Sequence, residues 1–202
     1  MNETIDRGGG KKLRIGMAYV EVTYADEDVF DKLKEFYLAC ADANVPHIER
    51  LWCKGGIIEK KNRFRLEPVG LERQPESADE LRTALRHVLR CVAALHDLGY
   101  CHCDIRWSNI VVKDDTWYLI DCTLATALTD DAELKHVSKL IKHRFVFDRD
   151  GPWSPRYDYY QVGLLLTDCE FGCAPQFDAV RDHLCDQRIG VTDVNFVVAQ
   201  FE

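Results

Sequence analysis

The sequence contains no long apolar run, no secretory leader and no surplus of basic residues. Its longest apolar stretches, such as residues 162–166, are far shorter than the ~20 residues that cross a bilayer. Residues 1–7 lack the apolar core of a signal peptide. The formal net charge is -8, whereas a nucleic-acid-binding protein needs a surplus of Lys and Arg on one face. We therefore expect a cytoplasmic or nuclear protein with no membrane or nucleic-acid partner.

Motifs of the common metal and phosphate sites are missing as well. The cysteines form no C-x-x-C pair and the histidines no H-x3-H pair, so zinc binding by residues 101–103 with Cys122 is not expected. The nine cysteines are an odd number and no leader is present, so reduced thiols are the default. Residues 8–12 read Gly-Gly-Gly-Lys-Lys, which does not match the phosphate loop G-x-x-x-x-G-K-[ST]. We interpret residues 1–12 as a flexible segment.

What is present is an ordinary globular composition, with 47% hydrophobic and 30% charged residues. A chain of 202 residues can bury a core without metals or disulfides. Alternation in residues 13–22 predicts a strand, and helical spacing of apolar residues from 26 to 43 predicts an amphipathic helix. Two short apolar runs, 57–58 and 64–66, predict a hairpin. Together these segments indicate a small region rich in strands.

The rest of the chain has a more helical pattern. A long helix is predicted to open at the capping box of residues 77–80 and to close at Gly99. Apolar runs on both sides of residues 113–116 predict a second hairpin. Residues 122–157 are polar and weakly periodic, and an apolar helix is expected to begin near Asp158. The chain is thus expected to be of the α+β class.

The pattern that indicates chemistry lies at residues 102–109, which read His-Cys-Asp-Ile-Arg-Trp-Ser-Asn. Phosphoryl transfer depends on aligning a hydroxyl with the γ-phosphate and on neutralising charge with Mg²⁺ and cations. Asp104 and Asn109 lie five residues apart with Arg106 between them, which is the spacing of a kinase catalytic loop. Asp121 follows at the end of the second hairpin strand, where its carboxylate could bind Mg²⁺. The spacing therefore predicts phosphoryl transfer.

Four segments carry a resemblance to a known family. They are Leu-Glu-Pro-Val-Gly at 66–70, the run 95–109, Trp-Tyr-Leu-Ile-Asp at 117–121 and Asp-Tyr-Tyr-Gln-Val-Gly at 158–163. Together they resemble a eukaryotic protein kinase, and more narrowly the fungal-type and Crinkler-effector kinase domains. The resemblance implies a protein-kinase-like two-lobe fold. A short, truncated N-terminal lobe would occupy residues 13–68, and a mainly helical C-terminal lobe would occupy residues 69–202.

The resemblance also implies an activity, cofactors and roles for individual residues. ATP and Mg²⁺ would bind between the lobes, and the γ-phosphate would pass to a Ser or Thr hydroxyl of a protein substrate. Asp104 would be the catalytic base and Arg106 the cation that faces the phosphate. Asp158 would brace the catalytic loop. The residues implied to contact the nucleotide or its metal are Glu67 and Val69 at the hinge, with Asn109 and Asp121 as the Mg²⁺ ligands.

The match to the kinase pattern is incomplete around the nucleotide. Val20 stands where the family has a strand lysine, and residues 8–10 do not form G-x-G-x-x-G. Lys11 or Lys12 could replace the lysine by reaching in from the flexible segment. The acidic partner on the helix would be Glu35, with Glu27 and Asp31 as the competing choices. The alternative function is therefore a pseudokinase that serves as a nucleotide- or protein-binding scaffold.

Two further departures concern regulation. Cys103 occupies the place of the arginine that pairs with a phosphorylated activation loop in the family, so activation by loop phosphorylation is not expected. Cys122 and Thr123 follow Asp121 in place of the usual Phe-Gly. The usual in/out switch of that aromatic ring is therefore not expected either.

Overall fold

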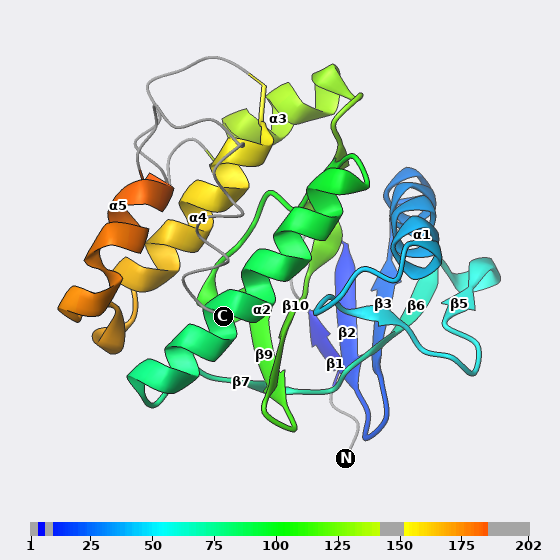
Figure 1. Cartoon of the computed structure of the whole chain (residues 1–202). Coiled ribbons are helices and arrows are strands. Elements are labelled where there is room, and N and C mark those ends of the chain that lie inside the picture. Colours follow the sequence, from blue (N-terminus) through cyan, green and yellow to red (C-terminus); the bar gives the residue numbers. More distant parts are fainter. Residues whose placement is uncertain (1–3, 7–9, 142–151, 186–202) are drawn as a thin grey trace.

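The computed structural model describes residues 4–6, 10–141 and 152–185, and its architecture is mixed α+β (Figure 1). The chain begins with an antiparallel sheet. Its strands lie in the order β1 (Thr4–Asp6), β2 (Lys11–Ile15), β3 (Val20–Tyr24), β6 (Arg63–Glu67) and β4 (Arg50–Leu51), and β5 (Ile57–Ile58) also pairs with β6.

Strand pairing extends further toward the N-terminus than the sequence indicated. β1 and the start of β2 lie within residues 1–12, which were expected to be flexible, and Thr4 pairs with Arg14. The single strand expected at residues 13–22 is also wrong. A turn closed by the Gly16 N–H and the Tyr19 carbonyl, 3.0 Å apart, divides it into β2 and β3. Pairing with distant β6 fixes this arrangement, and no local pattern shows such pairing.

Helix α1 (Glu27–Asp42) covers one face of this sheet (Figure 1). Asp26 caps it by accepting the backbone N–H groups of Asp28 and Val29. The Phe30 ring stacks on Phe64 of β6 at 4.6 Å between ring centres. The predicted helix is confirmed, and its buried residues are those that the spacing indicated: Phe30, Leu33, Phe36, Tyr37 and Cys40.

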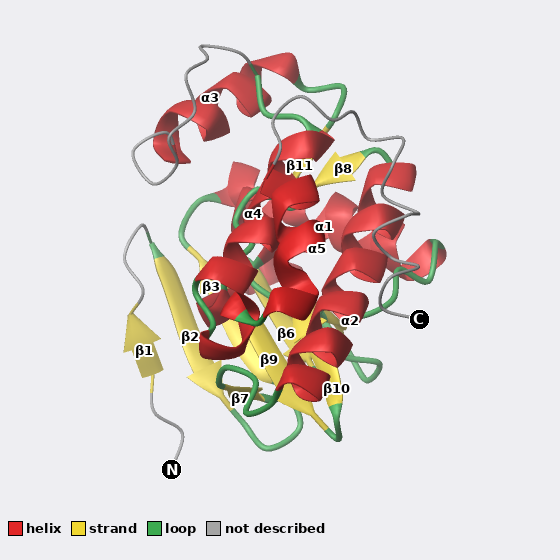
Figure 2. Cartoon of the chain, turned by 60° about the vertical axis from the view of Figure 1, so that its left-hand side comes forward, coloured by secondary structure: helices red, strands yellow, loops and turns green. Residues whose placement is uncertain are grey.

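The second part of the molecule is mainly helical. Ser77 caps α2 by accepting the Glu80 N–H at 3.1 Å, and Gly99 follows the helix with φ +86, so the predicted start and end are confirmed. Helix α4 begins earlier than expected, because Pro155 at its first turn has no N–H that needs a partner. Figure 2 shows helices α2, α4 and α5 packed together. Their bounds are α2 (Ala78–Asp97), α4 (Pro155–Thr167) and α5 (Asp178–Cys185).

The predicted second hairpin is confirmed as β9 (Ile110–Lys113) and β10 (Thr116–Leu119). β7 (Leu71–Glu72) pairs with β9, and β8 (Tyr100–Cys101) pairs with β11 (Thr126–Ala127). Helix α3 (Asp131–Ile141) lies in the segment that appeared only weakly periodic, and among residues 131–138, whose side chains are described, Leu134 and Val137 are buried. That short apolar stripe explains why the helix was missed.

Residues 47–49 join the two parts. The Glu49 N–H donates to the Leu119 carbonyl at 2.8 Å, and the Leu119 N–H donates to the His47 carbonyl at 2.8 Å. A second connection runs from β6 through Gly70 to β7, and a Cβ on Gly70 would lie 2.8 Å from the side chain of Val111. The end of hairpin β9–β10 is thereby held against the first sheet.

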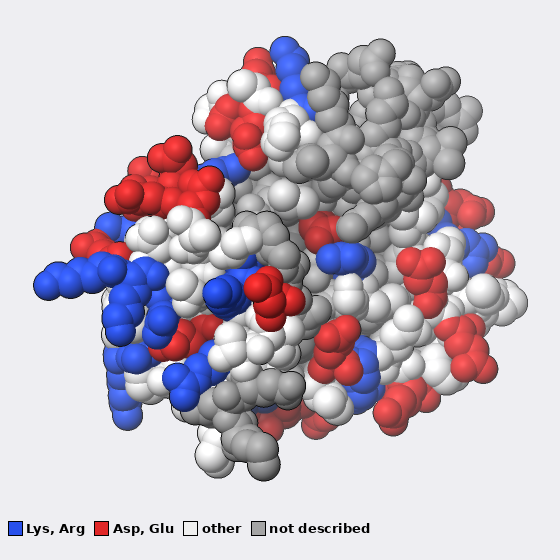
Figure 3. All heavy atoms as spheres, turned by 180° about the vertical axis from the view of Figure 1, so that it is seen from behind, with Lys and Arg blue, Asp and Glu red and all other residues white. Residues whose placement is uncertain are grey.

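Charge is unevenly spread over the surface. In the face shown in Figure 3, Lys and Arg gather toward one edge, although the net charge is -8. On the face of the first sheet away from α1, Lys12, Arg14 and Arg63 line a shallow hollow with Glu21. No helix within the described ranges is both long enough and apolar enough to cross a membrane.

Candidate functional site

Asp104 and Asn109 lie together in the loop between β8 and β9. The Asn109 side chain donates through Nδ2 to the Asp104 carboxylate at 2.9 Å and to the Asp104 backbone carbonyl at 2.8 Å. An Arg106 guanidinium nitrogen lies 3.3 Å from the same carboxylate. Asp104 and Asn109 are buried, whereas the Arg106 side chain is 47% exposed. The carboxylate is therefore fixed, and the cation beside it can turn toward solvent.

Asp121 lies next to Asn109 because hairpin β9–β10 brings the ends of its two strands together. Ile110 pairs with Leu119, and the Ile120 N–H donates to the Asn109 carbonyl at 2.8 Å. Within the described residues, Asn109 Oδ1 and Asp121 Oδ2 have no hydrogen-bond donor. Amide and carboxylate oxygens are ligands that Mg²⁺ accepts. The chemistry of these two oxygens fits Mg²⁺.

Lys11 reaches the same carboxylate from β2. Its Nζ lies 2.5 Å from Asp121 Oδ1 and 3.0 Å from Thr123 Oγ1, and the Thr123 hydroxyl donates to Asp121 Oδ1 at 2.6 Å. Burial alone would raise the pKa of Asp121, but the Lys11 ammonium and these hydrogen bonds hold the pKa below its ordinary value. Asp121 is thus held ionised beside Lys11, one of the two lysines that the sequence offered as a replacement for the strand lysine.

The side chains of β2 explain why Lys11, and not Lys12, occupies this position. Successive residues of a strand face opposite sides of the sheet. Lys12 lines the hollow on the face away from α1, whereas Lys11 contacts Asp121. Val20 begins β3 and pairs with Ile15 of β2. Alternation along residues 11–15 was the signal that could have separated the two lysines, but a flexible segment was expected there.

The three candidate acids of helix α1 form no ion pair with Lys11 within the described residues. Glu27, Asp31 and Glu35 are all exposed, and among the described residues the ion-pair partner of Lys11 is Asp121, so an acid partner from this helix stays a prediction. The buried face of α1 instead carries Tyr37, whose hydroxyl donates to Glu49 Oε1 at 2.6 Å. The apolar spacing that buries one face of the helix is what turns these acids toward solvent.

Glu49 is a buried acid that the sequence did not single out. It is 8% exposed, and its Oε1 also accepts the backbone N–H of Cys122 at 3.1 Å. Burial raises the pKa of Glu49, and the charge of Asp121 adds to this effect, while Tyr37 and Lys11 oppose it. Glu49 and Lys11 are therefore bound to two consecutive residues, Cys122 and Asp121.

Asp158 of α4 holds the loop in place, as predicted. Its carboxylate accepts the backbone N–H groups of His102 at 2.8 Å and Cys103 at 3.0 Å, and Trp153 Nε1 donates to it at 2.9 Å. Gln161 of the same helix accepts the Ile105 N–H at 2.9 Å and donates to the Cys103 carbonyl. This helix therefore positions the loop through its backbone. Cys103 and Cys122, the two positions at which the sequence differs from the kinase pattern, each carry a buried thiol.

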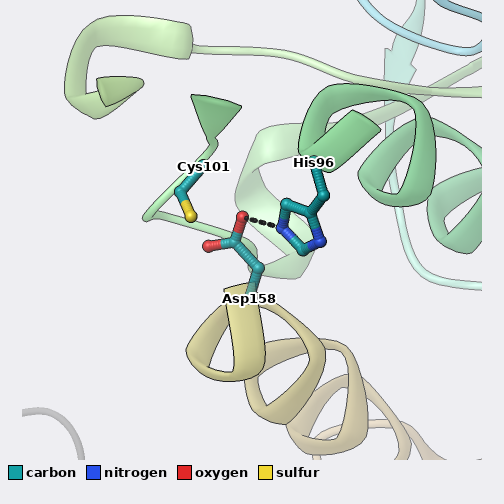
Figure 4. Close-up of side chains that lie close together, drawn as sticks. All are labelled: His96, Cys101 and Asp158. Carbon is teal, nitrogen blue, oxygen red and sulfur yellow. Dashed lines mark hydrogen bonds and ion pairs between the residues drawn. The ribbon is translucent and has the colours of Figure 1, made fainter. Parts of the chain in front are cut away.

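His96, Cys101 and Asp158 form a buried cluster whose potential ligand atoms lie within 4.8 Å of one another (Figure 4). His96 Nε2 lies 3.0 Å from Asp158 Oδ2. Burial lowers the pKa of His96, but the hydrogen bonds and charge of Asp158 and Cys101 outweigh burial and raise it to about 9. Each oxygen of the Asp158 carboxylate already has two hydrogen-bond partners. The cluster therefore holds the loop in place, and the ion pair between His96 and Asp158 is part of it.

The two hinge candidates lie in the link between β6 and β7. Glu67 ends β6, and its carboxylate accepts Arg50 Nε at 2.9 Å. Val69 follows outside any strand, and within the described residues neither its N–H nor its carbonyl has a backbone partner. Backbone groups without partners can pair with a ligand. The structure thus leaves Val69 able to contact a ligand, while the Glu67 side chain is engaged.

Comparison with known proteins adds a family context. No protein-family model matches the chain. Crinkler effector protein 8 of Phytophthora infestans is 33% identical over 172 residues, which cover 80% of this chain and 27% of that protein. Serine/threonine-protein kinase PknL of Mycobacterium tuberculosis is 30% identical over 125 residues, covering 59% of this chain and 31% of that protein.

Cyclin-dependent kinase F-3 of Oryza sativa subsp. japonica is 27% identical over 124 residues, which cover 60% of this chain and 28% of that protein. The chain thus spans less than a third of the length of each of these relatives. These similarities support a place for this chain in a kinase-like superfamily.

Proposed function

We propose that this chain is a protein kinase-like phosphotransferase that transfers the γ-phosphate of ATP to a Ser or Thr hydroxyl of a protein. The placement of Asp104, Asn109 and Asp121 at one end of hairpin β9–β10 carries the proposal. Two of the relatives are named as kinases, which supports the reaction class. The name of PknL supports Ser/Thr as the acceptor.

Asp104 is the general base in this proposal. Asn109 fixes its carboxylate through a hydrogen bond at 2.9 Å, and Asp158 fixes the loop backbone on which it stands. A base held in this way can accept the proton of a hydroxyl placed within hydrogen-bond reach. Arg106 is half-exposed, so its guanidinium can leave Asp104 and face the transferred phosphate.

The nucleotide side uses residues from both parts of the molecule. Asn109 and Asp121 would hold Mg²⁺, which when bound neutralises charge on the phosphates. Lys11 supplies a cation beside them, and Val69 offers free backbone groups to the base of the nucleotide. Residues 13–68 and 69–202 would then act as two lobes with ATP between them.

A pseudokinase scaffold is the second candidate, and one contact favours it. Lys11 occupies an oxygen of Asp121, the carboxylate that we assign to Mg²⁺. If this ion pair persists in the presence of Mg-ATP, the chain keeps the shape of the site without its chemistry. The two candidates therefore differ in phosphate transfer and not in fold.

Two measurements on the purified chain test the proposal. Mg-ATP at 100 times its dissociation constant should stabilise the fold by about 2.7 kcal/mol in a thermal-shift assay. Radiolabelled phosphate should enter a Ser/Thr-containing acceptor protein, and Asp104→Asn should lower this rate by about 10²–10⁴-fold, because the base is lost. The matched control is Glu59→Gln, which removes an exposed acid that pairs with Lys34.

The outcomes separate the candidates. Equal rates for the wild type and Asp104→Asn would contradict the role of Asp104. A thermal shift with no phosphate transfer by the wild type would favour the scaffold. The absence of any shift with Mg-ATP would contradict both nucleotide-dependent functions.

A further inference from the structure

Glu49 is a buried acid for which the proposed chemistry has no use. Both of its hydrogen bonds, from the Tyr37 hydroxyl and the Cys122 N–H, go to Oε1. Within the described residues, Oε2 has no donor. The Tyr37 hydroxyl and the Cys122 N–H thus orient the carboxylate through one oxygen and leave Oε2 available to a further donor.

The neighbouring cation is Lys11. Its Nζ is bound to Asp121, and the next residue, Cys122, donates its N–H to Glu49. The charges of Lys11 and Asp121 both act on Glu49. Lys11 is thus paired with Asp121, and Glu49 is bound to the next residue along the chain.

Asp121 does not suit Lys11 and a divalent cation at the same time. A cation on Asp121 Oδ2 would share one carboxylate with the Lys11 ammonium, and like charges this close repel each other. Lys11 then needs a second acidic partner. The acids of helix α1 are exposed, whereas Glu49 is buried and its charge interacts with that of Lys11.

We propose that Glu49 is a positioning residue that holds Lys11, through Oε2, when the site binds Mg-ATP. The inference rests on the proposed function and deepens it. Lys11 would exchange Asp121 for Glu49 and present its ammonium group to the phosphates. Helix α1 contributes to this arrangement through the Tyr37 hydroxyl, which orients Glu49, instead of supplying an acid itself.

A double-mutant cycle on Mg-ATP affinity tests the pair. Glu49→Gln keeps an acceptor oxygen for Tyr37 and Cys122 but removes the charge that holds Lys11, and Lys11→Met removes the cation. Each single substitution should weaken Mg-ATP binding by about tenfold, the scale of one charge-assisted hydrogen bond. Both substitutions remove the same interaction. The dissociation constant of the double variant for Mg-ATP should therefore be at most about twofold higher than that of whichever single variant binds less tightly.

Two more variants make the test specific. Glu49→Asp keeps the charge and should restore part of the affinity lost in Glu49→Gln. Tyr37→Phe keeps the carboxylate but removes its orienting hydroxyl, and should weaken binding by a few-fold; it also serves as the test if Glu49→Gln lacks a cooperative melting transition. The control Glu59→Gln should bind Mg-ATP like the wild type.

The inference and the proposed function fail in different ways. Wild-type affinity in Glu49→Gln, or losses that add up in the double variant, would overturn the role of Glu49 while leaving Mg-ATP binding intact. A wild-type chain that does not bind Mg-ATP would overturn the proposed function and this inference with it. Equal losses for ATP with and without Mg²⁺ would also overturn it, because the exchange of partners is tied to the cation.

Discussion

The two sides of the candidate site are built in different ways. The acceptor side, around Asp104, is formed by residues close in sequence and fixed by one helix through Asp158 and Gln161. The phosphate side, around Asp121, depends on Lys11 from β2 and on Glu49 from the segment before β4. The acceptor side is therefore a local motif that a buried carboxylate holds in place. The phosphate side forms only because strands distant in the sequence pair with each other.

This difference explains why the kinase-like pattern is intact on one side and altered on the other. A loop whose backbone is bound to a buried carboxylate has little freedom to vary in shape. An ammonium group on a long side chain can reach the same carboxylate from more than one strand. In this chain the cation comes from Lys11 of β2, and β3 begins with Val20.

The largest effect is expected from removing the Asp158 carboxylate, which holds the loop on the acceptor side. Asp158→Ala leaves His96 and three N–H groups without their acceptor in a buried environment. We expect a loss of about 3–5 kcal/mol in the free energy of unfolding, the usual cost of removing one partner of a buried ion pair. Chemical denaturation measures it. A loss below 1 kcal/mol would show that the loop is held by other contacts.

Removing the cation on the phosphate side should affect activity more than stability. Lys11→Met should lower phosphate transfer by about 10²–10³-fold, because one preorganised group that stabilises charge is lost. The melting temperature should fall less than in Asp158→Ala, since the Lys11 and Asp121 side chains are 14% and 34% exposed, whereas Asp158 is fully buried. Lys12→Met, which changes the neighbouring residue on the opposite face, is the control. Similar losses for both variants would contradict the assignment.

The acceptor side could be predicted from the sequence because its information is local. The spacing from Asp104 to Asn109 is visible in a short window, and so is Asp121 of the phosphate side, which hairpin β9–β10 brings next to Asn109 as expected. Asp158 was also identified, and the contacts of its carboxylate with the loop backbone confirm its bracing role.

The partners of Asp121 on the phosphate side could not be assigned from the sequence, because they depend on strand pairing. Lys11 lies near Asp121 only when β2 pairs with β3 and β3 with β6. Glu49 is an acid in a segment with no periodic pattern, and its burial follows from the bridge between residues 47–49 and Leu119. The sequence therefore offered Lys11 and Lys12 as alternatives for the cation but could not choose between them, and it did not indicate Glu49.

The ion pair that anchors the acceptor side should give stability a characteristic dependence on pH. The pKa of His96 is raised to about 9, above its ordinary value near 6.5. Its contribution is therefore complete below pH 6.5 and is lost as the pH rises through about 9. The free energy of unfolding should fall over this range in the wild type, and His96→Gln should flatten the curve. An unchanged slope in that variant would contradict the ion pair.

The smallest effect is expected from a change that touches neither side directly. Ser77 caps helix α2, which carries His96 at its other end, and its hydroxyl accepts the Glu80 N–H at 3.1 Å. Ser77→Ala should cost about 1 kcal/mol in the free energy of unfolding, while Mg-ATP affinity and the effect of Asp104→Asn stay unchanged. The variant thus tests whether a general loss of stability of this size changes Mg-ATP affinity. If it weakened Mg-ATP binding as much as Lys11→Met does, the loss in Lys11→Met would reflect stability and not a lost contact with phosphate.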